Sequence, residues 1–328
     1  MRQEILSRLV AAGAGGLSGQ ELATWLGLSR TAVWKHIAAL REEGYRIEAE
    51  PGSGYRLVNG DDLLIPANLE RQRLPRRFGA QYHYHPSLDS TNLAARRLAM
   101  ANAPEGTVVA ADQQLAGRGR LGRHWVSAAG LGLWFSVIVR PSVPPHQLAL
   151  VTLLTAVAAA EGIEEVAGTI VGIKWPNDLV IGGRKTAGIL TEAGTELDRV
   201  DYIVIGIGIN ILHRPEDFPP ELRATATSLA QAGGNVPTRP ALLAAILRWL
   251  DHDYQGWLGG DLTWLERWRC RSVTLGRTVT VKESGSQYRA LAIDVDSDGA
   301  LIVQTGDGGR RRVVAGEVSL GGYRGDSA

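Results

Sequence analysis

Helical hydrophobic patterns fill the first forty residues, and a strand pattern follows them. Apolar side chains at helical spacing predict a helix over residues 2–12, and two shorter helical patterns come after it. Ser18, with Glu21 three residues later, predicts a capping box at the second helix. Gly27 ends that helix and Ser29 caps the third. The alternating segment after the third helix predicts a hairpin, so this order is typical of a winged helix-turn-helix.

The third predicted helix carries the side chains expected to contact DNA. In a helix-turn-helix, the second helix of the pair enters the major groove, so we expect operator DNA to bind through residues 19–38. The hairpin turn at Pro51–Gly54 would form the wing. A small helical interaction module is the alternative, because acidic and basic residues are nearly balanced in this region. The residues on the expected DNA-facing side are Arg30, Thr31, Trp34, Lys35 and His36.

From about residue 67 to residue 269, strand and helix patterns alternate, which predicts an α/β layer structure with a mixed sheet. The stretch LWFSVIVRP predicts a strand that stops at Pro141, and residues 147–162 predict a helix packed on it. The stretch DYIVIGIGINI is almost entirely apolar and predicts a buried strand. Residues 170–193 predict strand, turn and strand around two glycines.

The last sixty residues predict short strands separated by glycine turns, which favours a small SH3-like β-barrel. The run Arg310–Arg312 is interpreted as a solvated strand end rather than a nucleotide contact. The expected domains are therefore a winged helix over 1–62, a central domain over 66–269 and a C-terminal domain over 270–328. The predicted strands are SVTLG, TVTVK, YRALAIDV, ALIVQT and RRRVVAGEVSL.

Composition narrows the classes of protein. With 45% hydrophobic and 21% charged residues, the chain can bury a large core. A net charge of +1 means that DNA binding must rest on local features, and it favours a dimer on two half-sites. The single cysteine, Cys270, cannot form an internal disulfide, and no apolar run approaches the roughly 20 residues that span a bilayer. We expect a cytoplasmic protein without a membrane partner.

Familiar nucleotide and metal motifs do not fit the sequence. GGRKT lacks the upstream glycine spacing of a P-loop, and GIGIN lacks the third glycine of a dinucleotide fingerprint. DVDSDG begins like a calcium loop but has Thr305 at position twelve, so a hairpin turn is the better interpretation. HYH at 83–85 has no third ligand nearby, and an ordinary strand is favoured. We expect no metal site made by protein ligands, and no serine or cysteine nucleophile.

Five polar blocks lie at the ends of the predicted strands: DSTN (89–92), QLAGRGRLGRHW (114–125), KWPND (174–178), GRKTAGILTE (183–192) and GIGIN (206–210). Alternating glycine and arginine can wrap an anion such as phosphate. In this order the blocks resemble the biotin protein ligases, and with the winged helix ahead of them the chain resembles those that also repress the biotin operon. The resemblance covers all three regions and implies a class II synthetase-like central domain.

The resemblance implies an AMP-forming carbon–nitrogen ligase. Biotin and ATP, with Mg²⁺, would give biotinyl-5′-AMP, and a lysine of the biotin carboxyl carrier protein of acetyl-CoA carboxylase would then attack it. The winged helix would act as a biotin-responsive transcriptional repressor, with a homodimer formed when the adenylate binds. The alternative is a biotin-sensing repressor with reduced ligase activity. Lipoate ligation is disfavoured by the glycine-arginine loop and the winged helix.

Carried over block by block, the resemblance implies three overlapping sets of residues. The biotin set is Ser90, Thr91, Asn92, Gln114, Arg118, Gly119, Arg120, Lys185, Gly188, Leu190 and Gly206. The nucleotide set is Arg123, Trp125, Asn177, Lys185 and Asn210. The catalytic set is Lys185, Arg118, Arg120 and Asp178.

Physical chemistry supports these assignments. Short hydroxyl and amide side chains suit the neutral ureido group of biotin, whereas Arg118, Lys185 and Mg²⁺ would offset the repulsion between carboxylate and phosphate. Asp178 would either accept a proton from the attacking lysine or help to hold Mg²⁺. An attack of one bound substrate on another needs positioning rather than a protein nucleophile.

Several positions stay open. Leu121 stands where the repressor-type loop often has another arginine, which puts ligand-linked dimer contacts in doubt. Phe218 is the one aromatic residue in the segment LHRPEDFPPELRATATSL that is expected to close over the adenine. Trp125 and Trp175 are interpreted either as pocket walls or as core anchors.

Overall fold

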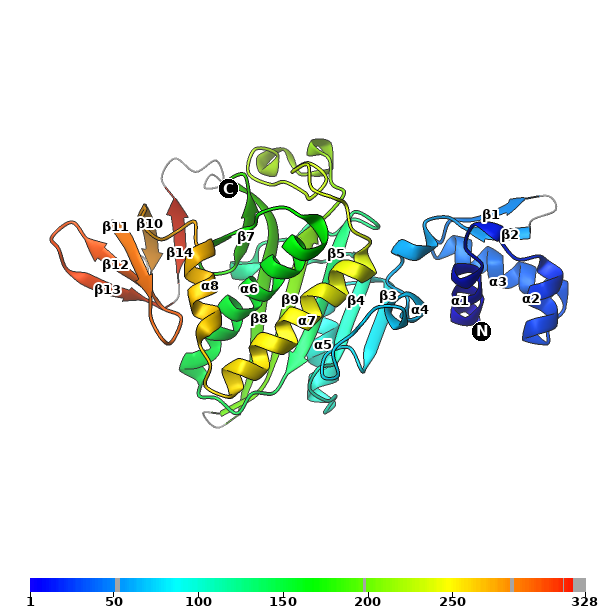
Figure 1. The fold of residues 1–328 in the computed structure, drawn as a ribbon, viewed down its shortest axis with the longest axis horizontal. Helices are drawn as coiled ribbons and strands as arrows, with labels where there is room; N and C mark the ends of the chain where they lie inside the picture. Colours follow the sequence, from blue (N-terminus) through cyan, green and yellow to red (C-terminus); the bar gives the residue numbers. More distant parts are fainter. Residues whose placement is uncertain (51–53, 197–198, 284–285, 315, 321–328) are drawn as a thin grey trace. The chain divides into compact units, whose positions relative to one another are not determined.

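The computed structural model of the protein describes residues 1–50, 54–196, 199–283, 286–314 and 316–320. The chain forms two compact units (Figure 1). Unit 1 contains residues 1–73 and 238–241, and unit 2 contains residues 74–237 and 242–328. Within the described ranges, no helix is both long enough and apolar enough to cross a membrane.

Unit 1 has the predicted order of three helices and a hairpin. The Ser18 and Glu21 capping box is present, and Gly27 adopts a φ of 65° at the end of its helix. The Ser29 side chain accepts a hydrogen bond from the Ala32 amide. The turn predicted at Pro51–Gly54 lies mostly outside the described residues. The elements are α1 (Arg2–Ala12), η1 (Gly13–Gly15), α2 (Gly19–Leu26), α3 (Arg30–Glu42), β1 (Ile47–Glu50), β2 (Gly54–Leu57), η2 (Gly60–Asp62) and α4 (Pro66–Glu70).

The core of unit 1 follows the helical spacing of its apolar residues. Val33, Ile37 and Leu40 of α3 are buried together with the apolar face of α1. The opposite face of α3 stays exposed, because the side chains between these buried positions point away from the core. Trp25 of α2 is 41% exposed, and the Arg8 guanidinium lies 3.7 Å from the centroid of its ring.

Unit 2 is built on a seven-stranded mixed sheet, which confirms the predicted class of fold. Its strand order is β3-β4-β5-β9-β8-β7-β6, and only the pair β3 and β4 is parallel. The stretch LWFSVIVRP forms most of β5, and the stretch DYIVIGIGINI forms most of β9, as predicted. The strands are β3 (Tyr82–Leu88), β4 (Val108–Gln114), β5 (Gly132–Val139), β6 (Gly172–Lys174), β7 (Asp178–Ile181), β8 (Arg184–Glu196) and β9 (Arg199–Asn210).

Helices cover both faces of this sheet. Successive residues of a strand point to opposite faces. Thr191 of β8 contacts Thr152 of α6 (Leu148–Ala167), with 2.7 Å between the hydroxyl oxygens. The next residue, Glu192, instead accepts a hydrogen bond from Asn92 of α5 (Thr91–Met100). Helices α5 and α6 therefore lie on opposite faces, and α6 extends five residues beyond the predicted end at 162.

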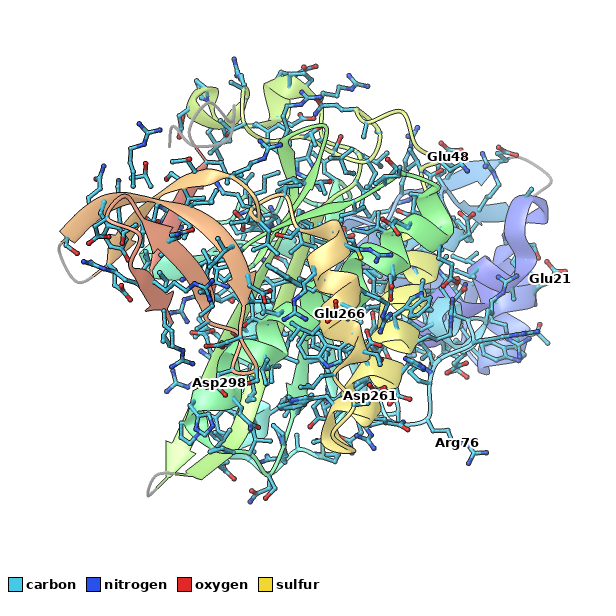
Figure 2. The ribbon with its side chains drawn as sticks, turned by 60° about the vertical axis from the view of Figure 1, so that its left-hand side comes forward. Glu21, Glu48, Arg76, Asp261, Glu266 and Asp298 are labelled. Atoms are coloured by element: carbon cyan, nitrogen blue, oxygen red, sulfur yellow. The ribbon has the colours of Figure 1, made fainter. Side chains whose placement is uncertain are left out.

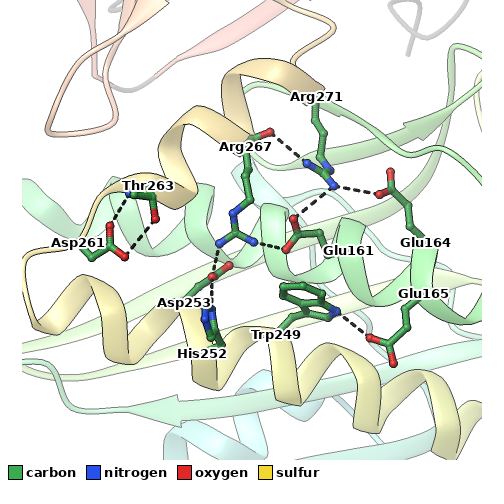
Figure 3. Close-up of polar contacts among 10 residues, drawn as sticks. All are labelled: Glu161, Glu164, Glu165, Trp249, His252, Asp253, Asp261, Thr263, Arg267 and Arg271. Carbon is green, nitrogen blue, oxygen red and sulfur yellow. Dashed lines mark hydrogen bonds and ion pairs between the residues drawn. The ribbon is translucent and has the colours of Figure 1, made fainter.

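Two further helices pack against α6 on the face away from α5: α7 (Arg239–Leu258) and α8 (Thr263–Arg271). Figure 3 shows the ion pairs that join them. Arg267 of α8 pairs with Glu161 of α6 and with Asp253 of α7, whose side chain is fully buried. Arg271 adds a contact of 3.0 Å to Glu164. This network fixes the helix layer on the side of the sheet opposite α5.

The C-terminal strands form a five-stranded antiparallel sheet in the order β13-β12-β11-β10-β14. The turn between β11 and β12 carries Asp298 (Figure 2), and it confirms that DVDSDG is a hairpin turn. Arg312 pairs with Asp296 and Asp298, as expected of a solvated strand end. The strands are β10 (Thr278–Glu283), β11 (Ser286–Val295), β12 (Leu301–Thr305), β13 (Arg310–Val313) and β14 (Glu317–Leu320).

Two predictions about these strands are wrong. SVTLG at 272–276 is not a strand, because the Ser272 hydroxyl accepts hydrogen bonds from the amides of Thr274 and Leu275 and closes a turn. RRRVVAGEVSL is two strands rather than one, since Arg310–Val313 pairs with β12 and Glu317–Leu320 pairs with β10.

Candidate functional site

A cavity of about 310 Å³ opens over the ends of β8 and β9, on the face that α5 covers. Glycines make room for it. A Cβ atom at Gly206 would lie 2.0 Å from Asn92 Oδ1, and one at Gly208 would lie 2.5 Å from the Trp125 indole nitrogen. Gly188 is equally covered by Trp125, with 2.9 Å to its ring. These strands therefore need glycine where other side chains approach the backbone.

The structure brings all of the residues predicted to bind biotin, to bind nucleotide or to act in catalysis into the lining of this one cavity, although their individual roles stay predictions. They are Ser90, Thr91, Asn92, Gln114, Arg118, Gly119, Arg120, Arg123, Trp125, Asn177, Asp178, Lys185, Gly188, Leu190, Gly206 and Asn210. Residues from all five blocks meet here because the blocks lie at strand ends on the same end of the sheet.

One end of the cavity is neutral and already hydrogen bonded. The side-chain oxygen of Gln114 accepts two hydrogen bonds from Thr91, one from its backbone amide at 2.8 Å and one from its hydroxyl at 3.1 Å. Ser136, which is fully buried on β5, donates to Asn92 Oδ1 at 2.6 Å. Ser90 begins α5 and makes no side-chain cap. Sequence reasoning missed Ser136, whose signal is a lone hydroxyl inside an apolar strand.

The other end is charged. Lys185, on β8, lies with its ammonium nitrogen 2.6 Å from Asp178 Oδ1 on the neighbouring strand β7. The same nitrogen is 5.3 Å from the centroid of the Trp125 ring. The Lys185 backbone pairs with the segment after Phe218, because its amide donates to the Thr225 carbonyl and its carbonyl accepts from the Thr227 amide. The turn through Gly182 and Gly183 thus delivers a fixed ammonium group to the cavity.

The glycine-arginine loop folds over the cavity, and its arginines contact three different places. Arg118 pairs with Glu192 at 3.1 Å. Arg120 donates to Asn177 Oδ1 at 3.0 Å and to the Gly316 carbonyl at 3.1 Å. Burial lowers the pKa of the Arg120 guanidinium, and the charges of Asp178 and Glu317 oppose that change. The loop is thereby fastened to both the central sheet and the C-terminal sheet.

The C-terminal sheet contributes to the cavity in a way that the sequence did not indicate. Glu317 at the start of β14 pairs with Arg123 and lines the cavity. Val318, Ser319 and Lys282 also line it. No local motif identifies these residues, because their role depends on a contact between segments almost two hundred positions apart.

The segment after β9 holds a small aromatic cluster. Phe218 is only 4% exposed, and its ring stacks on His213 with 5.0 Å between centroids and 15° between planes. His213 meets Trp134 edge-on at 5.9 Å. Burial lowers the pKa of His213, whose two ring nitrogens have no hydrogen-bond partner in the part of the chain that the structure describes. One face of Phe218 is therefore covered by His213, although the residue still borders the cavity.

Trp125 and Trp175, which the sequence predicts to be either pocket walls or core anchors, have different environments. Trp125 lies over Gly188 and Gly208 and walls the cavity. Trp175 is 3% exposed, and its indole nitrogen donates to the Gly299 carbonyl at 3.2 Å. Trp175 borders the cavity but is also an anchor between the central and C-terminal sheets.

In unit 1, the predicted DNA-contacting residues share the outer side of α3. Arg30, Thr31, Trp34 and Lys35 are exposed, and His36 is partly buried. Trp34 is 57% exposed, which is unusual for tryptophan in a folded domain.

Comparisons with known proteins agree with this picture. Residues 84–210 match the biotin/lipoate A/B protein ligase family, residues 2–56 match an HTH domain, and residues 274–321 match the biotin protein ligase C-terminal domain. The chain is 40% identical to the bifunctional ligase/repressor BirA of Bacillus subtilis, over 98% of this chain and 99% of that protein. It is 32% identical to the bifunctional ligase/repressor BirA of Escherichia coli, over 92% of each.

A solved structure of the biotin protein ligase from Aquifex aeolicus, in complex with biotin and ATP, is also similar. Its TM-score is 0.62, its sequence identity is 27%, and the match covers 74% of this chain and 98% of that one.

Proposed function

The chain belongs to the biotin protein ligases of the bifunctional ligase/repressor type, and from this we propose that it joins biotin to ATP and transfers the biotinyl group to a carrier protein. The observation that carries the proposal is the cavity itself, because an end rich in hydroxyl and amide groups continues into an end lined by Lys185, Arg120 and Arg123. Membership of this family confirms the predicted fold and enzyme class.

The two ends suit the two halves of an acyl adenylate. At the neutral end, Ser90 and Thr91 would bind the ureido group of biotin, with Gln114 holding Thr91 in place. At the charged end, Lys185 would hold the biotin carboxylate beside the α-phosphate of ATP. Two anions repel each other, so the ammonium and the loop guanidinium groups would offset the repulsion and stabilise the departing pyrophosphate.

Asp178 is the carboxylate that contacts Lys185, and two roles follow from that place. It could accept a proton from the carrier lysine, which is mostly protonated at neutral pH because an unperturbed lysine pKa is about 10.4. Alternatively it could help to hold Mg²⁺. An Asp178→Asn enzyme that made adenylate and transferred biotin at normal rates would contradict both roles.

Magnesium would enter with ATP. Among the described residues, no group of three or more His, Cys, Asp or Glu side chains is placed to hold a metal ion. Mg²⁺ bound with ATP usually keeps several waters and takes one or two carboxylates together with substrate phosphates. Asp178 would be the protein ligand, and the ion would supply charge stabilisation at the phosphates.

Unit 1 supports a second role as a biotin-responsive repressor that binds operator DNA. Its exposed Arg30, Thr31, Trp34 and Lys35 lie on the helix that enters the major groove in such domains. We also propose a homodimer on the adenylate-bound form and a cytoplasmic location. Leu121, which stands where the repressor-type loop often has an arginine, is 73% exposed with a φ of 55°, so this departure lies at the surface of the glycine-arginine loop.

Biotin-dependent exchange of labelled pyrophosphate into ATP tests the first half of the reaction. The proposal predicts exchange with biotin and none with lipoate. Exchange that needed lipoate, or none with either acid, would contradict it.

A further inference from the structure

Glu192 lies beside the cavity on β8, the strand that also carries the lining residues Lys185, Gly188, Ile189 and Leu190. It follows Leu190 by two positions and Gly188 by four on β8, so the three side-chain positions share one face of the sheet. Its side chain is 26% exposed. A partly buried carboxylate needs partners that offset its loss of hydration.

The two oxygens of this carboxylate bind two different parts of the site. Oε1 lies 3.1 Å from Arg118 Nη1 in the glycine-arginine loop. Oε2 accepts a hydrogen bond of 2.8 Å from the amide nitrogen of Asn92, at the start of α5. One side chain therefore connects the loop that covers the cavity to the helix that begins at the neutral end.

The contact with Glu192 also fixes how the Asn92 amide is oriented. Its nitrogen must face Glu192, because an ionised carboxylate can only accept. Its oxygen then faces Ser136, which donates at 2.6 Å, and Gly206, whose missing Cβ makes room for it. Reversal of the amide would place two acceptors against each other at Glu192.

We propose that Glu192 is a positioning residue that couples the glycine-arginine loop to the biotin end of the cavity, by holding Arg118 and Asn92 at the same time. The inference rests on the proposed function, since it concerns retention of biotin. Glu192 is not among the described residues that line the cavity. It acts through Arg118, so its loss should weaken binding of biotin more than it slows the chemical step.

The test compares the wild-type chain with Glu192→Gln, which keeps the shape and removes the charge. Asp201→Asn is the matched control, because Asp201 is an exposed carboxylate on β9 that pairs with Arg140 at 3.4 Å, outside the cavity. Two quantities are measured: KM for biotin and kcat in adenylate formation, and the biotin concentration, at saturating ATP, that protects the loop from trypsin. Trypsin cleaves after Arg118, Arg120 and Arg123, so the rate of cleavage measures directly how well the loop is covered.

Glu192→Gln should raise KM for biotin roughly tenfold with little change in kcat, which is the size of effect expected from one charge-assisted hydrogen bond. Protection of the loop should need correspondingly more biotin, and Asp201→Asn should match the wild type. Wild-type KM and wild-type protection in Glu192→Gln would overturn the inference, as would a lowered melting temperature as the sole change. A wild-type chain that forms no adenylate would instead overturn the proposed function.

Discussion

Among the single residues of the cavity, opposite charges are already paired within the protein: Lys185 with Asp178, Arg118 with Glu192 and Arg123 with Glu317. ATP and biotin are anions that need the same cations. Bound ATP and biotin would therefore share these cations with the carboxylates that already position them. The internal pairs also keep a strongly cationic cavity from standing uncompensated when it holds no anion.

A test at Trp34 distinguishes sequence-specific contacts with DNA bases from nonspecific attraction to phosphate. An exposed indole on a helix in the major groove can contact the methyl group of thymine. Trp34→Ala should weaken binding to an operator fragment selected by the protein roughly tenfold, within the range of one good base contact. Replacing thymine by uracil in the fragment should weaken the wild type but not the variant.

Trp25→Ala is the control for this binding measurement, because Trp25 is also exposed in unit 1 but stacks on Arg8. Equal loss in both tryptophan variants would mean that Trp34 has no special contact with DNA.

At the scale of elements, the glycines of β9 decide whether the cavity exists. Gly206→Ala would put a methyl group against Asn92, which Ser136 and Glu192 hold from other sides. We expect adenylate formation to fall at least tenfold, the effect of about 1.4 kcal/mol in binding free energy. Gly306→Ala is the control, since nothing lies within 4 Å of an added Cβ there. Kinetics with both variants check the prediction, and unchanged biotin affinity in Gly206→Ala would contradict it.

The segment after β9 should be sensitive to acid. Burial lowers the pKa of His213 below its ordinary value near 6.5, so the unfolded chain binds a proton more readily than the folded one. Stability from this group is complete above pH 6.5 and falls as the pH drops towards the folded pKa. His213→Phe keeps the ring stacking and removes the titration. Its melting temperature should fall less than that of the wild type between pH 7.5 and pH 5.5, as calorimetry can measure.

Helix-capping residues and the spacing of apolar residues correctly predicted those helices and strands that depend on interactions within a few residues. Ser18 and Ser29 cap helices, and the apolar runs became buried strands, because each effect acts within a few residues. SVTLG became a turn because the Ser272 hydroxyl competed with strand pairing. The polar blocks located the cavity, but they gave no role to Glu192, the last residue of GRKTAGILTE, and did not include Ser136 or Glu317. Their importance comes from partners far away in the sequence.

For the whole molecule, the two compact units predict separable activities. Deleting residues 1–60 should abolish DNA binding while most biotin transfer remains. The deletion keeps Asp62, which accepts hydrogen bonds of 2.8 Å from the Arg239 amide and guanidinium at the start of α7. Electrophoretic mobility shift and transfer assays on the same preparation check this. Loss of transfer in a truncated chain that stays folded would show that the ligase depends on unit 1.

The central claim is that this chain attaches biotin to a protein. The most direct measurement is the mass of a biotin carboxyl carrier domain after incubation with the full chain, biotin and Mg-ATP. The account predicts a gain of one biotinyl group, with none when Lys185→Gln replaces the wild type. Arg289→Gln, an exposed cation on β11 outside the cavity, should behave as wild type. An unchanged carrier mass with the wild-type chain would contradict the account.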